Sequence, residues 1–261
     1  MKLNYREYGS YHESRSTLVF LHGLLGSSVN WHGIVRALES DYHILVPDLR
    51  NHGQSPHSDD VSYQSMATDV AELLDDQGLE SATLIGHSMG GKVAMWLALS
   101  QPQWIDQLAV VDIAPVSYPN RFSKLFEALQ SVDLANLESR QHADQQLARY
   151  LTDFGLRQYL LQNLMLDKDR WCWRVNLIEL ASQMPEIIAF PDIGSTAPFL
   201  GETLFIYGGN SDYLAPAYEG QVRELFPYAR LRSIAGAGHW VYAEQPQLFL
   251  GVLKGFLGDT D

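Results

Sequence analysis

The stretch ATLIGHSMGGKVAMWLALS at residues 82–100 decides the fold of this chain. Its first residues, ATLI, are apolar and include β-branched side chains, as in a buried strand. Its last residues, VAMWLALS, are mostly good helix formers. Between the two lies G-H-S-M-G at residues 86–90, whose glycines permit a turn too tight for bulkier side chains. The stretch therefore predicts a strand, a sharp turn with Ser88 at its tip, and a helix.

Similar short apolar runs recur along the chain and alternate with amphipathic segments. At residues 62–77, for example, Met66, Val70, Leu73 and Leu74 recur at helical spacing. This alternation is typical of a parallel sheet with helical crossovers. We expect an α/β protein with a mostly parallel central sheet flanked by helices. The predicted strands are residues 17–22, 42–47, 82–86, 108–113, 203–207 and 229–235, with 3–8 as an edge strand.

Residues 116–198 interrupt the alternation. No strand is convincing there, whereas helical patterns recur at residues 122–130, 144–155, 157–165 and 175–183. A helical insertion between two strands is most simply a cap over the carboxyl edge of the sheet, where open α/β folds bind ligands. We therefore predict a core made of residues 1–115 and 199–261, with a helical cap at 116–198.

The composition argues against several classes of protein. Hydrophobic residues make up 46% of the chain and charged residues 19%, which is typical of a globular protein. A net charge of −13 argues against a nucleic-acid partner, since phosphate binding needs clustered Lys and Arg. No run of about 18 apolar residues occurs, so we expect no stable membrane insertion. The single cysteine, Cys172, and the lack of a secretory signal at the start favour the cytoplasm.

The motif at residues 86–90 is the strongest chemical signal. A G-x-S-x-G between a strand and a helix predicts a nucleophile elbow, and a turn with a passenger serine is the weaker alternative. A serine needs a base, and we select His239 because it follows the last predicted strand and lies downstream of Ser88. His87, His22 and His52 are interpreted as packing or hydrogen-bonding residues. No group of histidines has the spacing of a metal site.

A second glycine-rich loop, H-G-L-L-G at residues 22–26, follows the first central strand. Backbone N–H groups of Leu24 and Met89 are predicted to form an oxyanion hole, and a simple connecting turn is the alternative. The acid that orients the histidine has two candidates at this stage. Asp112 ends one predicted strand and Asp212 follows another, so both are expected at the carboxyl edge of the sheet.

Five blocks together resemble the YbfF-type bacterial esterases and their mitochondrial relatives: residues 50–57 (RNHGQSPH), 86–92 (GHSMGGK), 110–118 (VVDIAPVSY), 208–213 (GGNSDY) and 235–246 (AGAGHWVYAEQP). The resemblance implies an α/β-hydrolase fold with a helical cap inserted after the sixth strand, no cofactor, and cleavage of carboxylic esters and thioesters. It assigns the acid to Asp112 and places Ser211 near the histidine. The chain departs from the family in carrying Asp212 where a non-acidic residue is usual, which keeps the second carboxylate in consideration.

The expected protein is a serine carboxylesterase that hydrolyses short- to medium-chain acyl esters or thioesters through Ser88, His239 and Asp112. Trp240 is expected either to line the substrate pocket or to brace the histidine loop. Two alternatives remain: a carbon–carbon bond hydrolase, which also uses a serine, and a ligand-binding receptor on a hydrolase scaffold. Haloalkane dehalogenases and epoxide hydrolases attack with aspartate at the elbow, so Ser88 argues against both.

Overall fold

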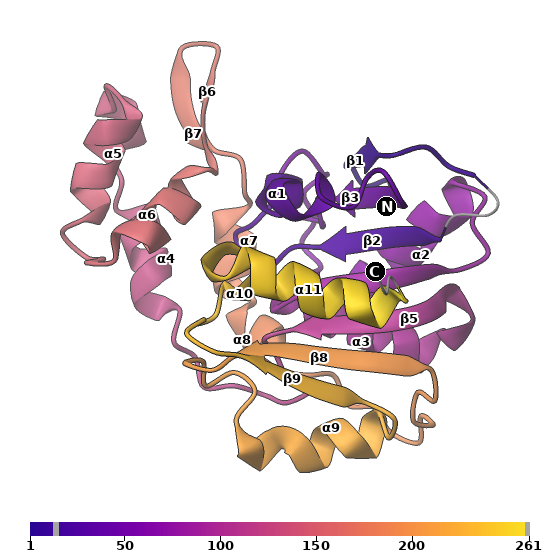
Figure 1. Ribbon diagram of the computed structural model, residues 1–261. Helices are drawn as coiled ribbons and strands as arrows, with labels where there is room; N and C mark the ends of the chain where they lie inside the picture. Colours follow the sequence, from indigo (N-terminus) through magenta and orange to yellow (C-terminus); the bar gives the residue numbers. More distant parts are fainter. Residues whose placement is uncertain (13–15, 259–261) are drawn as a thin grey trace.

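A seven-stranded sheet forms the centre of the computed structural model, which describes residues 1–12 and 16–258 (Figure 1). The strand order is β1-β3-β2-β4-β5-β8-β9. β1 pairs with β3 in the antiparallel sense and the remaining pairs are parallel, so the predicted α/β class is confirmed. The strands are β1 (Tyr5–Tyr8), β2 (Thr17–Leu21), β3 (His43–Pro47), β4 (Ala82–His87), β5 (Ile105–Val111), β8 (Glu202–Gly208) and β9 (Arg230–Ile234).

Helices cover both faces of this sheet. On one face, α2 (Tyr63–Asp76), α3 (Met89–Ser100) and α9 (Glu219–Leu225) contribute to the larger hydrophobic cluster. On the other, α1 (His32–Val35), α10 (Val241–Glu244) and α11 (Pro246–Leu257) pack in a second cluster. Figure 1 shows α11 in front of the sheet and α3 behind it. Because both faces are covered, the central strands β2 and β4 are buried throughout, which explains their continuous apolar sequence.

The chain between β5 and β8 forms an insertion beyond the carboxyl ends of the central strands (Figure 1). It contains the helices α4 (Ser123–Gln130), α5 (Arg140–Leu147), α6 (Phe154–Leu161), α7 (Leu177–Ser182) and α8 (Met184–Ile188). The segment predicted as one helix at 144–155 is interrupted, because Asp153 caps a new helix by accepting a hydrogen bond from the Leu156 N–H.

The expectation of no strand in the insertion is wrong. A hairpin of β6 (Leu164–Asp167) and β7 (Arg170–Trp173) pairs antiparallel. Lys168 and Asp169 form its two-residue turn with φ of 44° and 65°, the backbone conformation of the tightest hairpins. Only the first two residues of β6, Leu164 and Met165, fall within the helical pattern predicted at 157–165.

The position of the insertion in the strand order also differs from expectation. Among the described residues, five strands (β1 to β5) precede the insertion, so it follows the fifth strand and not the sixth. In addition, β5 begins at Ile105 and ends at Val111, earlier than predicted, so Asp112 lies just outside the strand.

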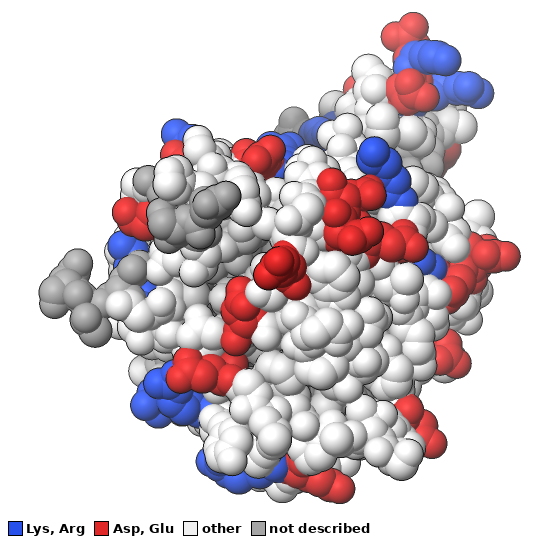
Figure 2. Space-filling model, turned by 90° about the vertical axis from the view of Figure 1, so that its right-hand side faces the viewer, with Lys and Arg blue, Asp and Glu red and all other residues white. Residues whose placement is uncertain are grey.

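Acidic residues outnumber basic residues in this chain, 31 to 18. On the face in Figure 2, acidic side chains are spread among larger uncharged areas and basic side chains form small separate groups. This agrees with the net charge of −13. In the part of the chain that the structure describes, no helix is both long and apolar enough to span a membrane.

Candidate active site

Ser88 lies at the tip of the turn between β4 and α3. Its backbone is strained, with φ of 52° and ψ of −118°, and its N–H donates to the Val111 carbonyl at 3.0 Å. Two glycines make the turn possible, because a Cβ on Gly86 would lie 2.3 Å from the Gly90 carbonyl oxygen, and one on Gly90 2.5 Å from the His22 carbonyl oxygen. A side chain at either position would push the neighbouring backbone segments apart. The local sequence thus dictates the position of the half-buried serine at the tip of the turn.

Asp112 occupies the equivalent place at the end of the neighbouring strand. Since β4 and β5 are parallel and His87 pairs with Val111, Ser88 and Asp112 reach the same edge of the sheet. The φ of Asp112 is also 52°, and its N–H donates to the Ile206 carbonyl at 2.8 Å. The carboxylate is buried, with 1% of the residue exposed.

His239, in the loop between β9 and α10, contacts both residues. Its Nδ1 lies 2.7 Å from Asp112 Oδ2 and its Nε2 lies 3.1 Å from Ser88 Oγ. With the Nδ1 proton donated to the carboxylate, Nε2 is left free to accept the serine proton. The imidazole stacks on the Tyr213 ring with centroids 4.0 Å apart and an interplanar angle of 24°, which fixes its plane. The three groups have the geometry needed to activate a serine nucleophile.

The two candidate carboxylates have different surroundings. Asp112 also accepts hydrogen bonds from the Gly208 N–H at 2.9 Å and from Ser211 Oγ at 2.5 Å. The Asp212 side chain is 62% exposed and forms an ion pair with Arg121 at 2.6 Å. The carboxylate that contacts His239 is therefore Asp112, and Ser211 lies beside it as the resemblance implied.

Leu24 and Met89, whose amides are predicted to form the oxyanion hole, lie in the two turns beside Ser88. Met89 is the first residue of α3, so the helix leaves its N–H without an internal partner. Leu24 lies in a tight turn closed by the Gly26 N–H and the Gly23 carbonyl at 3.0 Å. Both residues line a cavity at Ser88.

Two buried histidines hold this turn. His22 accepts a hydrogen bond from the Leu49 N–H at 2.9 Å, and His52 accepts one from the Leu25 N–H at 3.1 Å. Burial lowers the pKa of both rings, that of His52 to about 3, so each is neutral and has an acceptor nitrogen. They position backbone and do not exchange protons in the physiological range.

His87, next to the nucleophile, packs against the catalytic histidine loop, with its ring 4.7 Å from that of His239. Its Nε2 lies 2.9 Å from the His239 carbonyl oxygen, and burial lowers its pKa well below the usual value. The neutral ring therefore donates to the histidine loop. Its contact is structural, as the sequence indicated.

Sequence reasoning missed the side chains that join the insertion to the core. Lys92, one helical turn after Ser88, donates to the carbonyls of Ile188 and Ala189 at 2.8 and 2.7 Å. Tyr159 Oη donates to the Leu24 carbonyl at 2.8 Å, and Asn163 Nδ2 donates to the Leu25 carbonyl at 2.7 Å. The available signal was Lys92 itself, a lone charge in an apolar helix.

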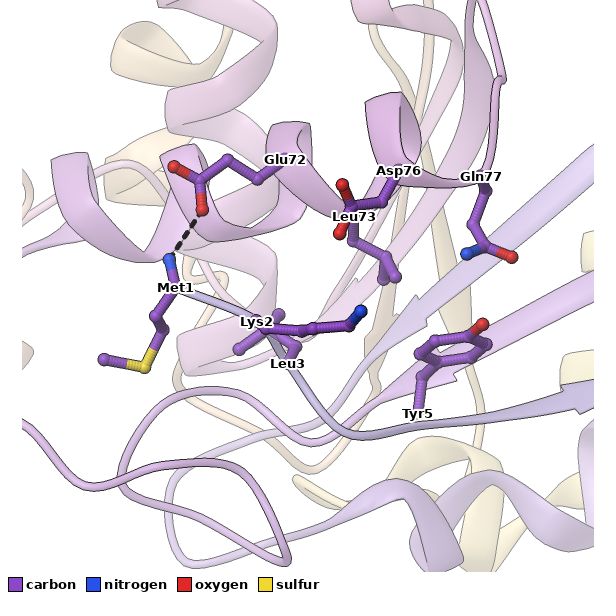
Figure 3. Close-up of a pocket in the computed structure, with 8 residues that line it drawn as sticks. All are labelled: Met1, Lys2, Leu3, Tyr5, Glu72, Leu73, Asp76 and Gln77. Carbon is purple, nitrogen blue, oxygen red and sulfur yellow. Dashed lines mark hydrogen bonds and ion pairs between the residues drawn. The ribbon is translucent and has the colours of Figure 1, made fainter.

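One cavity lies at the serine and another lies near the first residues of the chain. Trp240 lines the cavity that contains Ser88 and His239, where its ring lies 5.7 Å from that of Tyr159. A separate cavity lies between the first residues of the chain and α2 (Figure 3). There the Met1 amine pairs with Glu72 at 2.6 Å, and no lining residue carries the chemistry described above. Among the described residues, no three or more His, Cys, Asp or Glu gather in a group that could hold a metal ion.

Comparison with known proteins places the chain in a family. The model of the alpha/beta hydrolase fold matches residues 16–246. The chain belongs to the α/β-hydrolase family. This α/β-hydrolase is 38% identical to the esterase YbfF of Escherichia coli K12, over 99% of its own length and all of the relative's. It is 40% identical to the mouse sn-1-specific diacylglycerol lipase ABHD11, over 92% of its own length and 80% of the relative's.

A solved structure gives the same result. A marine microorganism esterase superimposes on the α/β-hydrolase with a TM-score of 0.94 and 38% identity, covering 98% of this chain and 99% of the other. The resemblance to the YbfF-type esterases, drawn from five sequence blocks, is therefore confirmed.

Proposed function

We propose that this protein is a serine carboxylesterase that hydrolyses short- to medium-chain acyl esters, and thioesters of similar size, through an acyl-enzyme intermediate. The observation that carries the proposal is the continuous contact from Ser88 Oγ through His239 to Asp112, over 3.1 and 2.7 Å. A hydroxyl, an imidazole and a buried carboxylate in this order are the groups that acyl transfer needs.

In the first half-reaction, Ser88 Oγ attacks the ester carbonyl while its proton passes to His239 Nε2. The N–H groups of Leu24 and Met89 stabilise the oxyanion, and the dipole of α3 favours the same charge. The intermediate collapses as His239 returns the proton to the departing alcohol. Asp112 stabilises the imidazolium throughout and holds the Nδ1 tautomer.

In the second half-reaction, water takes the place of the alcohol. His239 removes one of its protons while its oxygen attacks the acyl-serine carbonyl. The acyl–oxygen bond to Ser88 then breaks, the serine regains a proton from His239, and the carboxylic acid leaves. All the proton transfers pass through His239 Nε2, so no further acid or base is required.

The relatives support the reaction class. They are named esterase, esterase/lipase and diacylglycerol lipase, and all three names denote hydrolysis of carboxylic esters. We further propose that residues 116–198 act as the cap over a core of 1–115 and 199–261, and that Trp240 contacts substrate. The partner is a small-molecule ester or thioester, and a cytoplasmic location stays a prediction.

The test compares wild type with Ser88→Ala on p-nitrophenyl esters from acetate to decanoate, with Ser100→Ala at the far end of α3 as control. Removing the nucleophile of such a triad lowers kcat by roughly 10⁴- to 10⁶-fold. The exposed Ser100 only donates to the Trp96 carbonyl, so its variant should retain the wild-type rate.

Several outcomes contradict the proposal. If wild type leaves every ester intact but cleaves a vinylogous diketo acid, the carbon–carbon hydrolase alternative is correct. Negligible turnover with tight retention of one ligand would indicate a receptor. A Ser88→Ala variant with an undiminished rate would place the nucleophile elsewhere.

A further inference from the structure

Three cavities adjoin one another at the carboxyl edge of the sheet. The inner pocket, about 30 Å³, is lined by apolar residues that include Ile113, Phe122 and Ile187. The serine cavity, about 250 Å³, contains His239. Ser88 lines both. The outer groove, about 580 Å³, lies between α6, α10 and the turn at residues 28–31.

The position of His239 separates the two parts of a bound ester. This residue must return its proton to the departing alcohol oxygen, so the alcohol lies on the side that His239 lines. His239 lines the serine cavity but not the inner pocket. Of the proposed oxyanion donors, Met89 lines the inner pocket but not the serine cavity, and Leu24 lines both. The acyl chain therefore extends into the inner pocket and the alcohol extends the other way.

The inner pocket is small and its far wall is fixed. A volume of about 30 Å³ corresponds to about two water molecules on the scale where one needs 10–15 Å³. The wall is the end of α8, whose carbonyls accept hydrogen bonds from Tyr63 at Ile187 and from Lys92 at Ile188 and Ala189. A longer chain would have to break these bonds. An acyl group of about two to four carbons fits without that cost.

The outer groove offers the space that the inner pocket lacks. Leu156, Tyr159 and Trp240 line both the groove and the serine cavity, so the two adjoin across these three side chains. An alcohol that passes beyond Trp240 therefore enters a volume more than twice that of the serine cavity. The bulk of the substrate belongs on the alcohol side.

The charges of the groove restrict the alcohol further. The acidic residues that line it are Asp153 and Glu244, and no Lys or Arg is among the described residues that line it. Both carboxylates are held in place: Asp153 accepts from the Leu156 N–H at 3.0 Å, and Glu244 from the N–H groups of Gly238 and Trp240 at 2.7 and 3.1 Å. Fixed negative charge repels phosphate-bearing groups and tolerates neutral ones.

We propose that the outer groove is the alcohol subsite, and that the enzyme prefers short acyl esters of extended, uncharged alcohols. This inference rests on the proposed serine esterase function and specifies its substrate class. It excludes phosphate-rich thioesters such as acetyl-coenzyme A as good substrates, although it allows short thioesters of small neutral thiols.

The first experiment varies one side of the ester at a time. With p-nitrophenol as the leaving group, kcat/KM should fall at least about 100-fold from butyrate to decanoate. With acetate as the acyl group, kcat/KM should rise about tenfold from ethyl to dodecyl acetate, because the longer alcohol buries more apolar surface. A decanoate preference, or no gain with alcohol length, overturns the inference.

The second experiment fills the groove. Ala243, exposed on α10, lines it, whereas the exposed Leu248 on α11 does not. Ala243→Trp should lower kcat/KM for dodecyl acetate at least about tenfold more than for p-nitrophenyl acetate, since only the long alcohol meets the new ring. Leu248→Trp is the matched control and should change neither rate. Equal losses for both substrates in Ala243→Trp would contradict the subsite, and residual cleavage of p-nitrophenyl acetate shows that the variant is folded.

The third experiment tests the charge. Acetyl-coenzyme A and S-acetyl-N-acetylcysteamine carry the same acyl group, with and without phosphates. The neutral thioester should have the higher kcat/KM by at least about tenfold, and added salt should narrow the difference. Preference for the coenzyme A ester overturns the charge argument. Failure of the function itself looks different, since then no ester is cleaved or Ser88→Ala stays active.

Discussion

The edge of the sheet that carries the proposed triad and the insertion beyond it are held in place by different kinds of contact. At the edge, backbone bonds to backbone: the Ser88 N–H donates to Val111 and the Asp112 N–H to Ile206, at 3.0 and 2.8 Å. Both residues have φ of 52°, a conformation that the surrounding strands must enforce. These two main-chain bonds position the backbone of both residues.

The insertion is joined to the core by a backbone bond from the Asn176 N–H to the Asn51 carbonyl at 2.9 Å, and also by individual side chains that reach carbonyl oxygens of the other region. Lys92 and Tyr63 bind the end of α8 from the core. Tyr159 on α6 and Asn163 just after it bind the glycine-rich turn. Single substitutions can remove these contacts without touching the sheet. Reaction chemistry and substrate fit are therefore separable in this molecule, and substitutions in the two regions should differ in the size and kind of their effects.

The largest effect is expected at the edge, from Asp112→Asn. An asparagine keeps the shape but cannot hold the required histidine tautomer, so kcat should fall about 10⁴-fold with every ester tested. Asp212→Asn is the matched control, and because that carboxylate is exposed and paired only with Arg121, its kcat should stay within about threefold of wild type. Steady-state kinetics on p-nitrophenyl acetate measures both. If Asp212→Asn shows the large loss, the acid has been misassigned.

This choice of acid shows where sequence information ends. Local patterns that require no knowledge of distant contacts predict the strand before the elbow and the helix after it, and they also single out Ser88 and His239. Asp112 and Asp212 both follow strand ends, and β5 and β8 are neighbours in the sheet, so position along the chain did not separate them. What separates them is side-chain direction at a residue with positive φ, which depends on the packing of the whole edge.

The same limit explains the errors in the insertion. The β6–β7 hairpin depends on two consecutive positive φ values at Lys168 and Asp169, residues with no strong sequence preference for that turn. The contact of Lys92 could not be predicted, because its partners are two carbonyls almost a hundred residues later and no local sequence pattern indicates them.

The second prediction concerns the lysine that joins the regions. Burial lowers the pKa of Lys92 to about 7 from the ordinary 10.5. Between these values the unfolded lysine is protonated while the folded one is largely neutral, so the unfolded state binds more protons and this group makes stability rise with pH. Well below pH 7 the lysine is protonated in both the folded and the unfolded state, so it does not make the free energy of unfolding depend on pH.

Lys92→Met removes this titration. From pH 7 to pH 9, wild type should gain about 2 kcal/mol in the free energy of unfolding relative to Lys92→Met. Urea unfolding at both pH values measures the difference, and Lys124→Met, at an exposed position on α4, is the control that should follow wild type. Parallel pH curves for wild type and Lys92→Met would show that the folded lysine keeps its ordinary pKa.

The smallest effect is expected from Tyr159→Phe, which removes only the hydroxyl that donates to the Leu24 carbonyl at 2.8 Å. The loss of one such bond is worth about 1 kcal/mol, or about fivefold in rate. The Leu24 N–H is a proposed oxyanion donor, so a looser turn should weaken the transition state more than the bound ester. For p-nitrophenyl acetate, kcat should therefore fall about three- to tenfold with KM little changed. The exposed Tyr150, also in the insertion, gives the control Tyr150→Phe, which should leave both constants unaltered. A rise in KM at constant kcat would instead mean that Tyr159 serves only to bind substrate, and the insertion would then have no part in positioning the oxyanion donor.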